Sequence, residues 1–67
     1  MDSLYKGDYL LEATTSHSYE IKKWNSQKNS YELLGVYIVN TDDFDVHKQV
    51  KLFEKLIEFY EELENPL

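Results

Sequence analysis

Residues 41–64, TDDFDVHKQVKLFEKLIEFYEELE, decide the fold of this chain. From residue 45 to residue 64 there is no glycine or proline, and glutamate, leucine and lysine are the commonest residues, all of which favour helix. This composition predicts one long amphipathic helix of about six turns and roughly 30 Å. Asp42 is expected to be its N-cap, with Asp45 at the third helical position, and Asn65-Pro66 is expected to end it.

The predicted helix carries two apolar stripes when consecutive residues are placed about 100° apart. The first, expected to pack on the core, comprises Val46, Val50, Phe53, Ile57 and Tyr60. The second lies roughly 100° away and comprises Leu52, Leu56, Phe59 and Leu63. Together the stripes cover more of the helix than one small sheet normally buries. We interpret the second stripe either as a core that extends further around the helix or as a dimer or partner interface.

Three strands are predicted before the helix, at residues 8–14, 19–24 and 31–39. Residues 1–7 are expected to be an extended or frayed lead-in. Gly35, inside the most apolar strand, predicts either a bulge or a close crossing by the helix. Because the links are short, the expected fold class is α+β: a three-stranded antiparallel meander followed by one long C-terminal helix, β-β-β-α, in a single small domain of residues 1–67.

The composition indicates the cellular compartment and the oligomeric state to expect for the chain. Its 67 residues include no cysteine, which excludes a disulfide framework and favours the cytoplasm. No signal-peptide or membrane-spanning pattern follows Met1, and the chain is expected to begin at its natural start. A core this small is near the lower limit for independent stability, so a homodimer is expected.

The net charge of −6 is concentrated near the C-terminus. Residues 42–67 contain eight acidic residues and three lysines, whereas residues 1–41 contain five acidic residues and four lysines. Like charges at helical spacing are neighbours, and four such residues are Glu54, Glu58, Glu61 and Glu62. This surface is either an ordinary solvated face or a selected binding surface. The chain has no arginine and few cations, which argues against direct nucleic-acid binding and favours a basic partner.

No catalytic, metal-binding or cofactor-binding motif is present. His47 lies near Asp43 and Asp45, but this stretch lacks the glycine and the alternating oxygen ligands of an EF-hand loop. The two glycines, Gly7 and Gly35, are isolated and make no phosphate-binding loop. We therefore expect a protein that is not an enzyme and that needs no metal or cofactor.

The acidic run DDFD at 42–45, followed by EKLIEFYEELE at 54–64, resembles the small acidic phage-encoded DNA-mimic and host-takeover inhibitor proteins. These include proteins that block the histone-like nucleoid protein of bacteria. The resemblance is one of type and composition, without a signature motif. The lysines at 48, 51 and 55 interrupt the acidic surface on which it rests. It implies an inhibitor in the host cytoplasm that blocks the DNA site of a basic DNA-binding protein. The residues expected to bind that partner are Asp42, Asp43, Asp45, Glu54, Glu58, Glu61 and Glu62.

The alternative function is a small interaction module, such as an antitoxin, an immunity protein or a subunit, that binds through an apolar helix or sheet surface. In that case Leu52, Leu56, Phe59 and Leu63 are the candidate contact residues, as they are for the dimer. The two functions differ in their response to salt, because complementary charge is screened and apolar contact is not.

Overall fold

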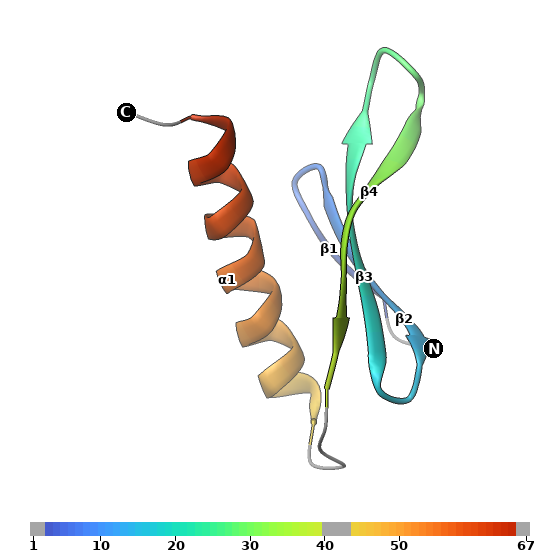
Figure 1. The fold of residues 1–67 in the computed structure, drawn as a ribbon, viewed down its shortest axis with the longest axis vertical. Coiled ribbons are helices and arrows are strands. Elements are labelled where there is room, and N and C mark those ends of the chain that lie inside the picture. Colours follow the sequence, from blue (N-terminus) through green and yellow to red (C-terminus); the bar gives the residue numbers. More distant parts are fainter. Residues whose placement is uncertain (1–2, 40–43, 66–67) are drawn as a thin grey trace.

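The computed structural model describes residues 3–39 and 44–65. Within these ranges the elements are β1 (Ser3–Lys6), β2 (Tyr9–Thr15), β3 (Ser18–Asn25), β4 (Ser30–Ile38) and α1 (Val46–Glu64). The strands form one antiparallel sheet in the order β1-β2-β3-β4. Figure 1 shows α1 lying along one face of this sheet. The α+β class and the C-terminal helix are therefore confirmed.

The prediction of three strands is wrong, because residues 3–6 form β1 rather than a frayed lead-in. β1 pairs with β2 up to Lys6 opposite Tyr9, which leaves a two-residue loop of Gly7 and Asp8. Gly7 has a φ of 58°, the left-handed conformation that two-residue hairpin loops require. A Gly-Asp pair between strand-like segments is the sequence signal for this hairpin.

The helix begins at Val46, and its N-cap is Asp45 rather than Asp42. The Asp45 carboxylate accepts a hydrogen bond from the Lys48 backbone N–H at 3.0 Å. Asp42 and Asp43 lie outside the described residues. Each of these aspartates is a chemically suitable cap, so composition could not choose between them; the path of the backbone selects Asp45.

The core lies between α1 and the sheet. Its buried members are Tyr9, Leu11, Tyr19, Ile21, Phe53, Leu56 and Ile57. Of the first predicted stripe, Phe53 and Ile57 are buried and Tyr60 packs against them, whereas the two valines are exposed. Only part of the first stripe therefore faces the core.

The second stripe is divided between core and surface. Leu56 is 7% exposed and lies in the core, and Leu52 packs at its margin, whereas Phe59 and Leu63 are exposed by half or more. The assignment of Leu56 to a dimer interface is therefore corrected, because its side chain already contacts the sheet of its own chain. The buried face of the helix is centred between the two stripes and includes Gln49.

Both features predicted for Gly35 occur together. The pairing of β3 with β4 shifts from Ile21 opposite Gly35 to Lys22 opposite Leu33, so Leu34 is the extra residue of a β-bulge. A Cβ atom added at Gly35 would lie 2.7 Å from the Tyr60 hydroxyl, which marks a close crossing by the helix.

Among the described residues, no helix is both long enough and apolar enough to span a membrane.

Candidate functional site

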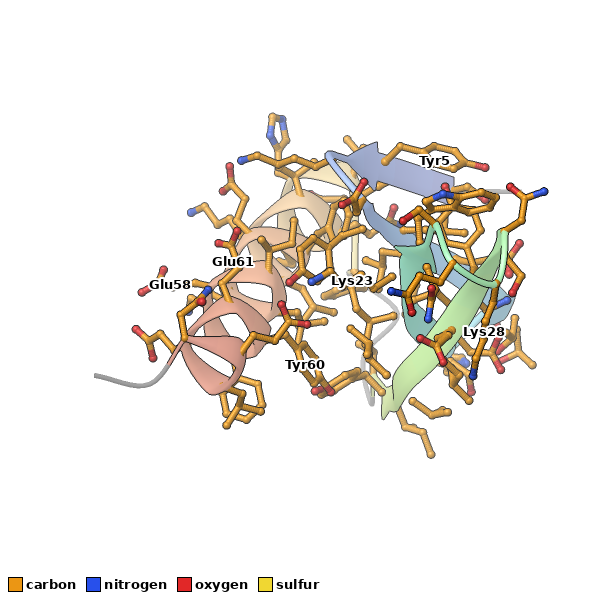
Figure 2. All side chains as sticks on the ribbon, turned by 90° about the horizontal axis from the view of Figure 1, so that it is seen from above. Tyr5, Lys23, Lys28, Glu58, Tyr60 and Glu61 are labelled. Carbon is orange, nitrogen blue, oxygen red and sulfur yellow. The ribbon has the colours of Figure 1, made fainter. Side chains whose placement is uncertain are left out.

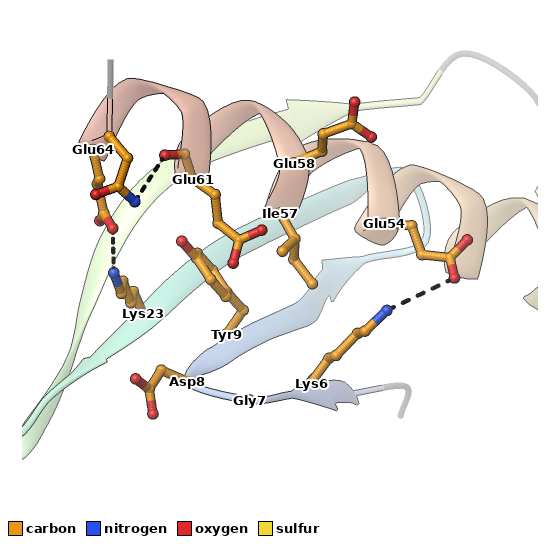
Figure 3. Close-up of a pocket in the computed structure, with 11 residues that line it drawn as sticks. Lys6, Gly7, Asp8, Tyr9, Lys23, Glu54, Ile57, Glu58, Glu61 and Glu64 are labelled. Carbon is orange, nitrogen blue, oxygen red and sulfur yellow. Dashed lines mark hydrogen bonds and ion pairs between the residues drawn. The ribbon is translucent and has the colours of Figure 1, made fainter. Parts of the chain in front are cut away.

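An open cleft of about 980 Å³ lies between the C-terminal half of α1 and the β1–β2 hairpin (Figure 3). The helix side is lined by Glu54, Ile57, Glu58, Glu61, Glu64 and the cap residue Asn65. The sheet side is lined by Lys6, Gly7, Asp8, Tyr9 and Lys23. The lining therefore carries five carboxylates and two ammonium groups. We name this feature the acidic cleft.

Helix periodicity places the glutamates of the cleft. Glu54, Glu58 and Glu61 fall on the flank of α1 next to Ile57, and Ile57 is buried against the sheet. Burial of Ile57 thereby holds this flank over the β1–β2 hairpin. Figure 3 shows the Glu61 side chain reaching toward Tyr9, while Glu58 turns away from the hairpin.

Both lysines of the cleft are already engaged by carboxylates. Lys6 Nζ lies 4.0 Å from a Glu54 oxygen, and Lys23 Nζ donates a hydrogen bond to Glu64. The hydrogen bond to Glu64 is the main cause that raises the pKa of Lys23. Within the described part of the chain, no ion pair engages Asp8, Glu58 or Glu61. The acidic cleft therefore retains an excess of negative charge.

Tyr9 forms the floor of the acidic cleft. It is 5% exposed, and its hydroxyl has no hydrogen-bond partner among the described residues. Burial is the main cause that raises the pKa of this phenol; the Glu64 and Glu61 carboxylates raise it further, while the nearby Lys23 ammonium opposes them. The ammonium stands 5.3 Å from the centre of the ring.

The structure brings together only part of the predicted binding set. Glu54, Glu58 and Glu61 line the acidic cleft, and Glu62 is exposed but outside its lining. Asp45 lies at the opposite end of the helix, where the Lys48 N–H lowers the pKa of its carboxyl group and the carboxylate serves as the cap. Asp42 and Asp43 fall outside the described residues.

Several residues that line the cleft were not among the predicted site residues, including Asp8, Tyr9 and Glu64. Glu64 lies one turn beyond Glu61, so helix periodicity could have identified it. Asp8 and Tyr9 depend on the β1–β2 hairpin, for which the Gly7-Asp8 pair is the sequence signal. That the hairpin lies under the glutamate flank follows only from the packing of the helix.

Figure 2 shows Glu58 and Glu61 on the helix and Tyr60 between the helix and the sheet. The exposed members of the second stripe, Phe59 and Leu63, are on the helix flank opposite the acidic cleft. The Phe59 ring lies 5.1 Å from the Tyr60 ring in an edge-on arrangement. The helix thus separates an acidic flank from an apolar one.

The chemistry available elsewhere in the described residues is limited. No group of three or more histidine, aspartate or glutamate side chains in 3–39 and 44–65 could hold a metal ion. His17 lies in an exposed turn, with its Nδ1 atom 3.0 Å from the Ser16 hydroxyl.

In comparisons with known proteins, no family model matches the chain, and no curated protein or solved structure matches it significantly.

Proposed function

We propose that this protein is a DNA-mimicking inhibitor that binds a basic DNA-binding protein through the acidic cleft. The observation that carries the proposal is the set of three carboxylates in the cleft, Asp8, Glu58 and Glu61, that no described lysine pairs. Lysine and arginine side chains of a partner would supply the missing counter-charges. These are the side chains with which a nucleic-acid-binding protein neutralises phosphates.

The carboxylates of the cleft support a cationic group as the bound species. Ammonium and guanidinium groups carry only hydrogen-bond donors, which the Glu58 and Glu61 carboxylates can accept. A phosphate would bring further negative oxygens toward carboxylates and would be repelled. The proposed ligand is therefore a basic side chain on a protein surface and not nucleic acid.

The spacing of the glutamates supports mimicry of a short part of one DNA strand. Residues 54, 58 and 61 rise along the helix axis in steps of about 6 Å and about 4.5 Å. Each strand of duplex DNA carries one phosphate per about 3.4 Å of axis, so the flank is a sparser row of the same sign. The proposed setting is the cytoplasm, the host cytoplasm if the source is a phage, and the proposed activity is binding without catalysis.

The test is displacement of fluorescent duplex DNA from a purified histone-like nucleoid protein. The cleft variant carries Asp8→Asn, Glu58→Gln and Glu61→Gln, which keep side-chain shape and remove charge. Each exposed charge pair contributes about 0.2 to 1 kcal/mol, so the variant should bind roughly three- to hundredfold more weakly. The loss should be greatest at low salt.

A matched control removes the same amount of charge from other parts of the sheet: Glu12→Gln, Glu20→Gln and Glu32→Gln. If binding depends on the charges of the acidic cleft and not on the total charge, this control should displace DNA almost as well as the wild type. A folded cleft variant that displaces DNA as well as the wild type does would contradict the proposal.

The second candidate function is the interaction module that binds a different protein through apolar surface. The observation that favours it is the exposure of Phe59, Leu63 and several apolar residues of β4. Binding of this kind should persist at high salt and should be insensitive to the cleft variant.

A further inference from the structure

β4 is an edge strand whose outer side has no neighbour among the described residues. The other edge strand, β1, is only four residues long, whereas β4 has nine. Natural proteins usually protect a long edge strand with charges, proline or a covering element, because its free backbone groups can pair with another chain. β4, SYELLGVYI, contains no proline and a single charged residue, Glu32.

The backbone hydrogen bonds determine which residues of β4 face this open edge. The Val39 N–H donates to the His17 carbonyl at 2.8 Å, so Val39 faces β3. Hydrogen-bonding direction alternates along an antiparallel strand, so the backbone groups of Ile38 and Val36 point away from β3, and those of Tyr37 point toward it. The apolar side chains of Val36 and Ile38 are also exposed, Ile38 by 71%.

Apolar surface continues on both sides of this edge. On the face of the sheet opposite α1, Leu33 is exposed together with Val36 and Ile38. On the helix side, Phe59 contacts Tyr60, and the Tyr60 hydroxyl donates to the carbonyl of Leu34 in β4. The edge of β4 is thus flanked by apolar side chains from the sheet and from the helix.

We propose that β4 pairs antiparallel with β4 of a second copy of this chain, to form a continuous eight-stranded sheet. An antiparallel pair of identical edge strands is self-complementary under a two-fold axis. Charge also favours a second copy at this edge. Each chain carries −6, and close approach of two copies is least opposed where charge is lowest. Glu32, the one charged residue of β4, is already bound by Lys28 and Asn25.

This proposal is independent of the proposed function. The acidic cleft lies over the β1–β2 hairpin, on the other flank of the helix from Phe59. Pairing through β4 would therefore leave both acidic clefts of the dimer accessible.

Amide hydrogen exchange of the wild type gives the first test. The amides of Val36 and Ile38 face the open edge in one chain, so they should exchange at least about tenfold more slowly in concentrated than in dilute solution. The Tyr37 amide faces β3 and serves as the reference that is protected in a single chain. Rapid exchange of Val36 and Ile38 in concentrated protein would overturn the proposal.

Sedimentation equilibrium gives the second test. The wild type should show twice the 8.0 kDa mass of one chain. The double variant Val36→Lys with Ile38→Lys places charges on exposed positions, so it should fold but sediment as one chain. The matched control, Tyr5→Lys, places a lysine at an exposed position on the other edge strand and should remain a dimer. A wild-type monomer, or a dimer broken by Tyr5→Lys and not by the β4 variant, would contradict pairing through β4.

Discussion

The hydroxyls of Tyr37 on β4 and Tyr60 on α1 lie 3.1 Å apart, within hydrogen-bond distance across the contact between sheet and helix. The Tyr60 hydroxyl also lies 3.3 Å from the carbonyl oxygen of Leu34, the extra residue of the β-bulge. This contact is possible because Gly35 has no Cβ atom. The bulge, the glycine and the two tyrosines therefore form one packing unit that seats the helix on β4.

Gly35→Ala should destabilise the fold by about 1 to 3 kcal/mol, the usual cost of inserting a methyl group into a packed contact. The new Cβ would lie 2.7 Å from the Tyr60 hydroxyl, so that ring must move and lose its two hydrogen bonds. Urea unfolding followed by circular dichroism measures the loss. Adding Tyr60→Phe removes the clashing oxygen, so the double variant should be more stable than the sum of the two single effects predicts. If the free-energy changes of the two single variants simply add in the double variant, the contact between the new Cβ atom and the Tyr60 hydroxyl is not the cause of the destabilisation.

The fold should lose stability at alkaline pH through Tyr60. Its hydrogen bond with Tyr37, followed by burial, raises the pKa of Tyr60 to about 12, from 10.0 for an ordinary tyrosine. Because the folded-state pKa is the higher one, the stabilisation is complete below pH 10 and is lost as pH rises toward 12. The free energy of unfolding should therefore fall in this window. Tyr60→Phe should fall less steeply; equal slopes for both proteins would assign the effect to another group.

Leu56→Asp and Phe59→Asp should have different effects on folding, although sequence analysis placed both residues on one stripe. Leu56 is buried, so an aspartate there loses its hydration and leaves a cavity, which should remove most or all of the stability. Phe59 is half exposed, and its substitution should cost about 1 kcal/mol or less, mainly from the lost ring contact with Tyr60. Thermal unfolding of both variants tests this difference, and a stable Leu56→Asp protein would contradict the described core.

Asp45→Ala should lower the melting temperature, because it leaves the Lys48 backbone N–H without its acceptor. The pKa of Asp45 is lowered, chiefly by that N–H, so its contribution is present above the ordinary pKa of 3.8 and is lost as pH falls through and below that value. Asp45→Asn, which retains a capping oxygen, should preserve most of the stability at neutral pH. A larger effect of Asp42→Ala than of Asp45→Ala would contradict the assigned cap.

The long helix and the α+β class could be predicted because they depend on local properties. The nineteen helical residues include no glycine or proline and many good helix formers, and apolar residues recur at the helical period. The first hairpin was missed because β1 has only four residues, too few for a periodic pattern to stand out. The sequence signal for this hairpin is the loop pair Gly7-Asp8. That pair predicts a hairpin only when a strand is recognised on each side of it.

The role of each apolar helix residue could not be predicted from periodicity. Both stripes have the helical spacing that predicts a buried face, and the sheet buries the face between them. Leu56 and Phe53 are therefore buried, whereas Phe59 and Val50 are exposed. The choice depends on the rotation of the helix about its own axis. That rotation is set by shape, including the space above Gly35 that admits Tyr60.

The sequence by itself determined the excess of acidic residues, their concentration near the C-terminus and the row of glutamates on one helix, since these follow from composition and spacing. Only the tertiary structure decided that Asp8 and Tyr9 of the first hairpin lie under that row, and that β4 has no neighbouring strand on its outer side among the described residues. Both results depend on contacts between residues far apart in the chain. Helix rotation and strand order establish those contacts together, and neither has a local signal.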